Sequence, residues 1–321
     1  MSTSSKFLKS AAIFSMLGLT LAACGDNGDD DANGDDPDEN DVEETDNGDD
    51  GDDNGEAAGD GGTITLGYVD GWTDGQSTTY LWQVLLEEQG YDVEIMDLTD
   101  AAPLYQGLAD GTIDVYPSAW LPNTHDSYMD EHGDDLEDLG YYYEGAVLTL
   151  AVPGYTDVDS IADLPDNADL FDGEVIGIEP AAGHMDTTGN VVFPEYGLDE
   201  DFELVESSTA AMMATLDNAL DAEEDIVVTL WRPFWAYDGE RDIKDLEDPE
   251  GLLGAEETLN LVANGDFSSE FPDVAEWMSN LELTDDEYAE LEDLVVNEYE
   301  GIEGAEVWVE NNQDLVDELI N

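Results

Sequence analysis

The chain of 321 residues has few cationic side chains, a single cysteine and three histidines. Five Lys and Arg residues stand against 84 Asp and Glu residues, so the net charge at pH 7 is −79. A chain this acidic repels phosphate backbones and anionic lipid headgroups, which excludes nucleic-acid binding and a basic membrane-docking patch. One cysteine excludes an internal disulfide framework and a cysteine-based zinc site. We therefore expect no metal and no cofactor.

Long apolar runs are also absent, because no segment reaches the ~18 apolar residues of a membrane-spanning helix. Residues 1–23 have the form of a secretory signal peptide, in which Lys6 and Lys9 precede a short apolar stretch. That stretch ends in Leu21-Ala-Ala-Cys24, which resembles a bacterial lipobox. The resemblance implies a lipidated Cys24 that anchors the protein in the cell membrane on its extracytoplasmic face. A plain secretory signal with an incidental cysteine is the alternative.

Residues 24–62 contain 18 acidic side chains, no basic one and almost no apolar one. Such a segment cannot bury enough apolar surface to offset its ordering entropy, so we expect a disordered tether. Calcium binding is an alternative for its aspartate runs. However, these runs lack the spaced ligands and the terminal glutamate of an EF-hand loop.

The globular part, from Thr63 onward, combines 66 acidic residues with only three basic ones. In dilute buffer, self-repulsion of this size opposes compaction. At molar salt the Debye length falls to about 3 Å, so the repulsion is largely screened. The composition therefore indicates a protein that works in strong brine, as in a halophile.

Strands and helices alternate along the globular part. The expected strands are 63–69, 92–98, 112–116, 146–152, 175–178, 202–205 and 225–230, and the expected helices are 77–89, 102–109, 188–196, 208–222, 269–282, 284–298 and 304–320. This alternation favours an α/β fold with parallel sheets. The pattern restarts near Val152, so we expect two lobes. Residues 63–152 and 255–321 would form lobe 1, and residues 153–254 would form lobe 2.

Three of the seven tryptophans stand at the ends of predicted strands. Trp72 follows the first strand, Trp120 follows the third, and Trp231 follows the last. In open α/β sheets, ligands bind beyond the carboxyl ends of the strands. Tryptophan is often buried for its area alone, so core packing is the alternative for each of them. Three such positions, spread over both lobes, indicate a ligand cleft.

Four strings around these tryptophans resemble the glycine betaine-binding proteins of ABC transporters. The strings are Gly67-Tyr-Val-Asp-Gly-Trp72, Ser118-Ala-Trp-Leu-Pro-Asn-Thr-His125, Ile176-Gly-Ile-Glu-Pro-Ala-Ala-Gly183 and Ile226-Val-Val-Thr-Leu-Trp-Arg-Pro-Phe-Trp235. The resemblance runs in one order from about residue 63 to about residue 285. It implies a type II periplasmic-binding-protein fold, in which two α/β lobes close on a ligand cleft.

The resemblance also implies the site residues. In the family, three tryptophans form a cage around a trimethylammonium group, and the matching positions are Trp72, Trp120 and Trp231. The ligand's carboxylate would be held by the His125 side chain and by the backbone amides of Gly177 and Ile178.

The sequence departs from the family around the last cage position, where Leu230-Trp-Arg-Pro-Phe-Trp235 replaces the common Gly-Trp-Thr-Pro-His-Trp. Arg232 either supports the carboxylate or pairs with surface acids. His132 and His184 have no expected role in the site.

A tryptophan cage suits a quaternary ammonium, which has no N–H group and is weakly hydrated. Each desolvated cation–π contact contributes on the order of 2 kcal/mol. Three contacts could supply roughly 6 of the ~8 kcal/mol that a micromolar affinity requires. A cage of carboxylates would instead collect the sodium or potassium of a brine. We therefore expect acidic side chains to be absent from the residues that touch the ligand.

The expected function is capture of the osmolyte glycine betaine and its delivery to the permease and ATPase subunits of an ABC importer. Another quaternary amine, such as proline betaine, choline or carnitine, is an alternative ligand. A lipoprotein that senses the solute without transport is an alternative function. An enzyme is not expected, because the sequence has no Gly-x-Ser-x-Gly elbow and no metal-ligand cluster.

The charge balance predicts that the globular part is most stable at molar salt. Thermal unfolding followed by circular dichroism should give a midpoint that rises steadily between about 0.05 and 3 M KCl, because the Debye length shortens over this range. A midpoint independent of salt would contradict the adaptation to brine.

Overall fold

The computed structural model describes residues 61–320, except 238, 240 and 300. The predicted signal peptide, Cys24 and the acidic tether lie outside the described residues. None of the helices in the described part is both long enough and apolar enough to cross a membrane.

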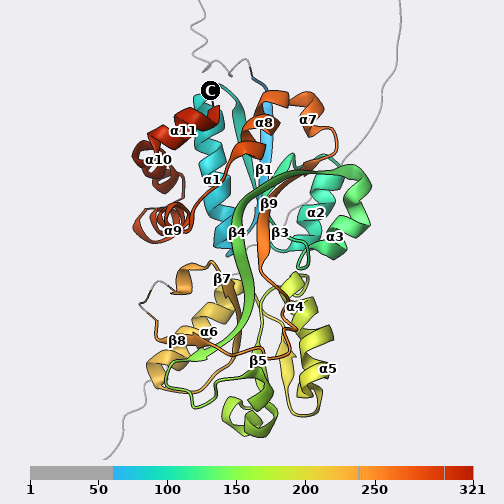
Figure 1. Cartoon of the computed structure of the whole chain (residues 1–321), viewed down its shortest axis with the longest axis vertical. Coiled ribbons are helices and arrows are strands. Elements are labelled where there is room, and N and C mark those ends of the chain that lie inside the picture. Colours follow the sequence, from blue (N-terminus) through green and yellow to red (C-terminus); the bar gives the residue numbers. More distant parts are fainter. Residues whose placement is uncertain (1–60, 238, 240, 300, 321) are drawn as a thin grey trace, which may run out of the picture. The chain divides into compact units, whose positions relative to one another are not determined.

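The described residues form a mixed α/β structure (Figure 1). The strands are β1 (Thr63–Val69), β2 (Asp92–Leu98), β3 (Val115–Leu121), β4 (Leu136–Pro153), β5 (Glu174–Ile176), β6 (Glu203–Val205), β7 (Val228–Arg232), β8 (Ile243–Asp245) and β9 (Glu257–Asn264). The α-helices are α1 (Thr73–Glu88), α2 (Ala101–Ala109), α3 (Asp126–His132), α4 (Gly183–Thr187), α5 (Phe193–Tyr196), α6 (Thr209–Ala222), α7 (Phe267–Glu270), α8 (Pro272–Asn280), α9 (Asp285–Asp293), α10 (Ile302–Asn311) and α11 (Gln313–Ile320).

Two groups of strands share the long strand β4 (Figure 1). In the first group the order is β2-β1-β3-β9-β4. In the second group the order is β4-β7-β5-β6, and the short strand β8 also pairs with β4. The first part of β4, from Leu136 to Ala146, pairs with β9, and the next part, from Val147 to Ala151, pairs with β7. The lobe boundaries at residues 152/153 and 254/255 stay a prediction.

The expectation of parallel sheets is right only in part, because each strand group contains both parallel and antiparallel pairs. Strands β1, β2 and β3 are parallel to one another, but β9 runs antiparallel to both β3 and β4. The sequence pattern did not predict β9, because polar side chains interrupt its apolar residues. Glu257 and Asn260 are both buried in this strand, and the Asn260 amide donates to the Asp138 carboxylate at 3.0 Å.

Two predicted boundaries near the tryptophans are also wrong. Trp120 lies inside β3, where it pairs with Leu259 of β9, and Trp231 lies inside β7. Helix α1 begins at Thr73, four residues before the predicted start at 77, so Trp72 stands at its N-cap. The polar turn from Thr73 to Gln76 has no apolar periodicity that would have revealed it.

Buried apolar side chains form two clusters, and the larger one extends across both strand groups. The larger cluster contains Trp82 of α1 and Trp308 of α10, both fully buried. The smaller cluster surrounds Val175 of β5 and Val227, the residue before β7. Trp72, which follows β1, and Ile178, which follows β5, both belong to the larger cluster.

Candidate ligand-binding site

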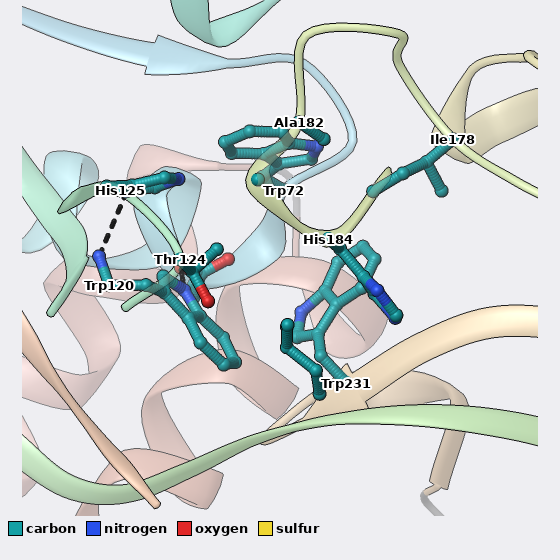
Figure 2. A pocket seen from close by; sticks show the side chains of 11 residues that line it. Trp72, Trp120, Thr124, His125, Ile178, Ala182, His184 and Trp231 are labelled. Atoms are coloured by element: carbon teal, nitrogen blue, oxygen red, sulfur yellow. Dashed lines mark hydrogen bonds between the residues drawn. The ribbon is translucent and has the colours of Figure 1, made fainter. Parts of the chain in front are cut away.

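One cavity is lined by residues from both strand groups, and the space free of protein atoms in it and in the solvent at its mouth is about 320 Å³. Figure 2 shows the indoles of Trp72, Trp120 and Trp231 on different sides of it. The full lining is Trp72, Asp74, Trp120, Thr124, His125, Leu148, Ile178, Ala182, Gly183, His184 and Trp231. Five of the six predicted ligand-binding residues are therefore brought together, and Gly177 is not among the lining residues.

The three tryptophans are held in different ways. The Trp72 indole Nε1–H donates to the Glu179 carboxylate at 3.0 Å, and the Trp120 Nε1–H donates to the Asp74 carboxylate at 3.0 Å. The Trp231 Nε1–H is buried and has no hydrogen-bond partner within the described part of the chain. The Trp231 ring packs instead against Phe234, with 4.3 Å between the ring centroids.

The expectation that acidic side chains are absent from the site is wrong. Asp74 lines the cavity and is only 1% exposed. Burial raises the pKa of Asp74, and hydrogen bonds from Ser118 and Trp120 oppose this rise. The sequence argument considered free carboxylates that bind metal cations. Here Oδ2 of Asp74 already accepts an indole N–H and a hydroxyl, so the carboxylate braces the cage wall.

The His125 ring is buried and its tautomer is set by the backbone. The Trp120 amide donates to His125 Nδ1 at 3.0 Å, so in the neutral ring the proton is on Nε2. Burial lowers the pKa of His125 to about 3, which keeps the ring neutral at physiological pH. The ring stacks on Trp72, with 5.9 Å between centroids and 14° between planes. Within the described residues, the Nε2–H group has no hydrogen-bond partner.

A buried glutamate fixes the turn that carries His125. The amides of Asn123 and Thr124 both donate to Glu257 Oε1, at 2.7 and 2.9 Å. This anchoring places the Thr124 carbonyl directly against Gly183, where an added Cβ atom would lie 1.9 Å from the carbonyl oxygen. Position 183 therefore admits no side chain in this conformation.

The structure does not leave the Gly177 and Ile178 amides free for a ligand. The Gly177 amide donates to the Val205 carbonyl at 2.9 Å, and the Ile178 amide faces the Met185 sulfur at 3.3 Å. The amides of Gly183 and His184 instead open helix α4 at the wall of the cavity, and neither has a hydrogen-bond partner within the described part of the chain.

Sequence reasoning missed these two donors, although the string that ends at Gly183 contained a signal. A glycine immediately before a helix start allows close approach of another segment. The His184 side chain, in contrast, has a structural role. Its Nε2 lies 3.0 Å from the Thr149 carbonyl and 2.9 Å from the Leu230 carbonyl, so it ties α4 to β4 and β7.

Arg232 does not line the cavity. Its guanidinium pairs with Asp245 at 2.8 Å and lies over the Tyr237 ring, 3.5 Å from the ring centroid. Of the two predicted roles, pairing with an acid is the one seen. The Tyr237 hydroxyl also bonds to Asp245 and to Thr149 of β4, so this cluster braces the segment that follows Trp231.

Comparison with known proteins identifies the family. Residues 62–311 match the family model described as the substrate binding domain of the ABC-type glycine betaine transport system. The chain belongs to this family. Its members are solute-binding components of transporters, not enzymes. The resemblance of the four strings to glycine betaine-binding proteins is therefore confirmed, as is the expectation that the chain is not an enzyme.

Two solved structures share the fold. The chain is 30% identical to the ProX glycine betaine/L-proline-binding protein of Borrelia burgdorferi, with a TM-score of 0.75 over 81% of this chain and 97% of that one. It is also 30% identical to lactococcal OpuAC in its closed form with glycine betaine, with a TM-score of 0.75 over 81% of this chain and 99% of that one. The type II periplasmic-binding-protein fold is therefore confirmed.

A curated relative matches over a shorter stretch. The glycine betaine/carnitine transport binding protein GbuC of Listeria monocytogenes is 32% identical over 173 residues, which are 53% of this chain. The match spans 56% of the relative's own length.

Proposed function

We propose that this protein is the extracytoplasmic solute-binding protein of an ABC importer and that its ligand is glycine betaine. The observation that carries this proposal is that one cavity is lined both by three buried indoles and by N–H donors that have no partner among the described residues. The captured osmolyte would be delivered to permease and ATPase subunits.

The indoles suit the cationic end of glycine betaine. A trimethylammonium group cannot donate a hydrogen bond, so it is recognised by aromatic faces and by nearby negative charge. Trp72, Trp120 and Trp231 supply the faces, and all three are at least 94% buried. The Asp74 side chain holds the Trp120 face in place, because its Oδ2 accepts the Trp120 N–H and the Ser118 hydroxyl.

The N–H donors suit the anionic end. Besides the Trp231 Nε1–H, the cavity donors that have no partner among the described residues are His125 Nε2–H and the amides of Gly183 and His184. Glycine betaine brings a carboxylate one methylene away from its ammonium, so a single cavity lined by indoles and donors can meet both ends. Choline lacks a carboxylate and would leave these donors with only a hydroxyl. Leaving a buried donor unpaired costs about 1–3 kcal/mol, which favours betaine.

Closure of two lobes on the ligand is part of the proposal. Lobe 1 comprises residues 63–152 and 255–321, and lobe 2 comprises residues 153–254. Support comes from the change of partner along β4 and from the two segments that meet at Thr124 and Gly183. Closing the lobes would shield the cation from water and bring together donors and indoles that are far apart in the sequence.

The cage predicts that removal of any one indole weakens binding. Trp72→Ala, Trp120→Ala and Trp231→Ala should each lose about 1–2 kcal/mol or more of cation–π attraction, which is roughly a 5- to 30-fold weaker affinity. His125→Ala should weaken glycine betaine but spare choline, which has no carboxylate for the ring to meet. Calorimetry at high salt measures both ligands.

Trp277→Phe is the control for the cage variants. Trp277 lies on α8, and its ring packs edge-on against Tyr91 away from the cavity. Its replacement should leave the affinity unchanged. If two of the three cage variants bind glycine betaine within a factor of two of the wild type, the cage assignment is wrong.

The close contact between Thr124 and Gly183 predicts that a side chain at position 183 weakens ligand binding. Gly183→Ala places a Cβ atom 1.9 Å from the Thr124 oxygen, so the closed site must open or distort. Overpacking of this kind typically costs about 1–3 kcal/mol, so calorimetry should show glycine betaine bound about 5- to 150-fold more weakly. Gly189→Ala is the matched control, because its Cβ would make an ordinary 3.4 Å contact with Leu204. Equal affinities for the two variants would contradict the tight contact.

We also propose that Cys24 is lipidated and holds the protein on the outer face of the cell membrane. The lipobox-like string and the family's role support this proposal. Cys24→Ala should release the protein from the membrane fraction into the soluble extracytoplasmic fraction, as measured by cell fractionation. A variant that stays fully membrane-bound would place the anchor elsewhere.

A further inference from the structure

We propose that Glu179 is a positioning residue for the cage: it accepts the Trp72 indole N–H when the lobes close and thereby holds the cage shut around the ligand. The inference deepens the proposed function and rests on it. Glu179 is 4% exposed and does not line the cavity, so its effect on the ligand must pass through Trp72.

Glu179 is held in place by its own lobe. Its Oε1 accepts the Thr209 amide at 2.7 Å, and its Oε2 accepts the Thr209 hydroxyl at 2.8 Å. Thr209 is the first residue of α6, and both residues belong to lobe 2. The third bond, from Trp72 Nε1 to Oε2 at 3.0 Å, comes from lobe 1. The carboxylate is thus oriented before Trp72 reaches it.

The other cage tryptophans lack this arrangement. The acceptor of the Trp120 N–H is Asp74, which lies in the same lobe as Trp120, so that bond persists whether the lobes are open or closed. The Trp231 N–H has no acceptor within the described residues. Among the three cage indoles, Trp72 is therefore the one whose hydrogen bond crosses from lobe to lobe.

Because the hydrogen bond from Trp72 to Glu179 joins the two lobes, we expect Glu179 to affect the rate of ligand dissociation. A bond that forms only on closure stabilises the closed complex, so its loss should raise the dissociation rate constant and leave the association rate constant nearly unchanged. A hydrogen bond to a buried charged acceptor corresponds to roughly a 10- to 100-fold change in affinity.

Glu179→Gln is the sharpest variant. Glutamine keeps the shape, and its single oxygen can accept the Thr209 amide, which leaves its NH2 group facing the Trp72 N–H. The Thr209 hydroxyl can rotate to accept from that NH2 group, so both hydrogen bonds to Thr209 are kept. The hydrogen bond from Trp72 is lost, because the NH2 group and the indole N–H are both donors. The unfolding midpoint without ligand should therefore match the wild type.

A double-mutant cycle with Trp72→Phe tests whether Glu179 acts through the indole N–H. Phenylalanine keeps an aromatic face but has no N–H. In stopped-flow experiments with glycine betaine at high salt, Glu179→Gln should speed dissociation at least about tenfold in the wild-type background. It should change dissociation by less than about twofold in the Trp72→Phe background, because no bond remains to be lost.

Tyr128→Phe is the control for the cycle. It removes another hydrogen bond between the lobes, from the Tyr128 hydroxyl to the Ala181 carbonyl at 2.6 Å, without contacting the Trp72 N–H. Its effect should be the same in both backgrounds, because it does not depend on the indole.

The outcomes separate the inference from the function beneath it. If Glu179→Gln has no effect, or the same effect with Trp72 and with Phe at position 72, the positioning role is wrong while betaine binding stands. If the wild type does not bind glycine betaine, both the proposed function and the positioning role are contradicted. Coupling in the Glu179 cycle without coupling in the Tyr128 cycle supports the role.

Discussion

Burying an indole takes its N–H group out of water, and the site depends on where that group finds an acceptor. Two of the three cage indoles use carboxylates that are themselves buried, Asp74 for Trp120 and Glu179 for Trp72. Each of these side chains fixes the angle of an aromatic face through its hydrogen bond to the indole N–H. The acids are tolerated there because hydroxyl and amide donors also satisfy their oxygens. The proposed cage for a cation is thus braced by acidic side chains that already accept hydrogen bonds.

The buried, hydrogen-bonded acidic residues at the site differ from the acidic residues on the rest of the globular part. Most acidic residues there are exposed, and the three basic residues all pair with acids, Arg232 with Asp245, Arg241 with Asp217 and Lys244 with Asp159. Exposed pairs contribute little in molar salt because they are screened. Buried contacts such as Glu257 with the Thr124 turn are screened much less. The site is therefore held together by buried hydrogen bonds, which salt weakens less than it weakens exposed ion pairs.

Much of the fold follows from local patterns, and much of the site does not. Strands β1 and β2 have the predicted bounds, because alternation of apolar and polar residues identifies a half-buried strand. Strand β9 escaped prediction because it buries polar side chains. The tryptophans were found from motifs, but Gly183 was not, because its role depends on Thr124, which is far away in the sequence. The burial of Asp74 and Glu179 could not be read from a chain with 84 acidic residues.

The central claim is that the cavity recognises a positive charge through aromatic faces. Its most direct test is calorimetry of the wild type with glycine betaine and with 3,3-dimethylbutanoate, in which carbon replaces the ammonium nitrogen. The two ligands share shape and carboxylate, but only one carries the cation. Glycine betaine should bind at least about tenfold more tightly, since three cation–π contacts of about 0.5–2 kcal/mol each are lost with the charge. Equal affinities would show that the cavity selects shape alone and would contradict the account.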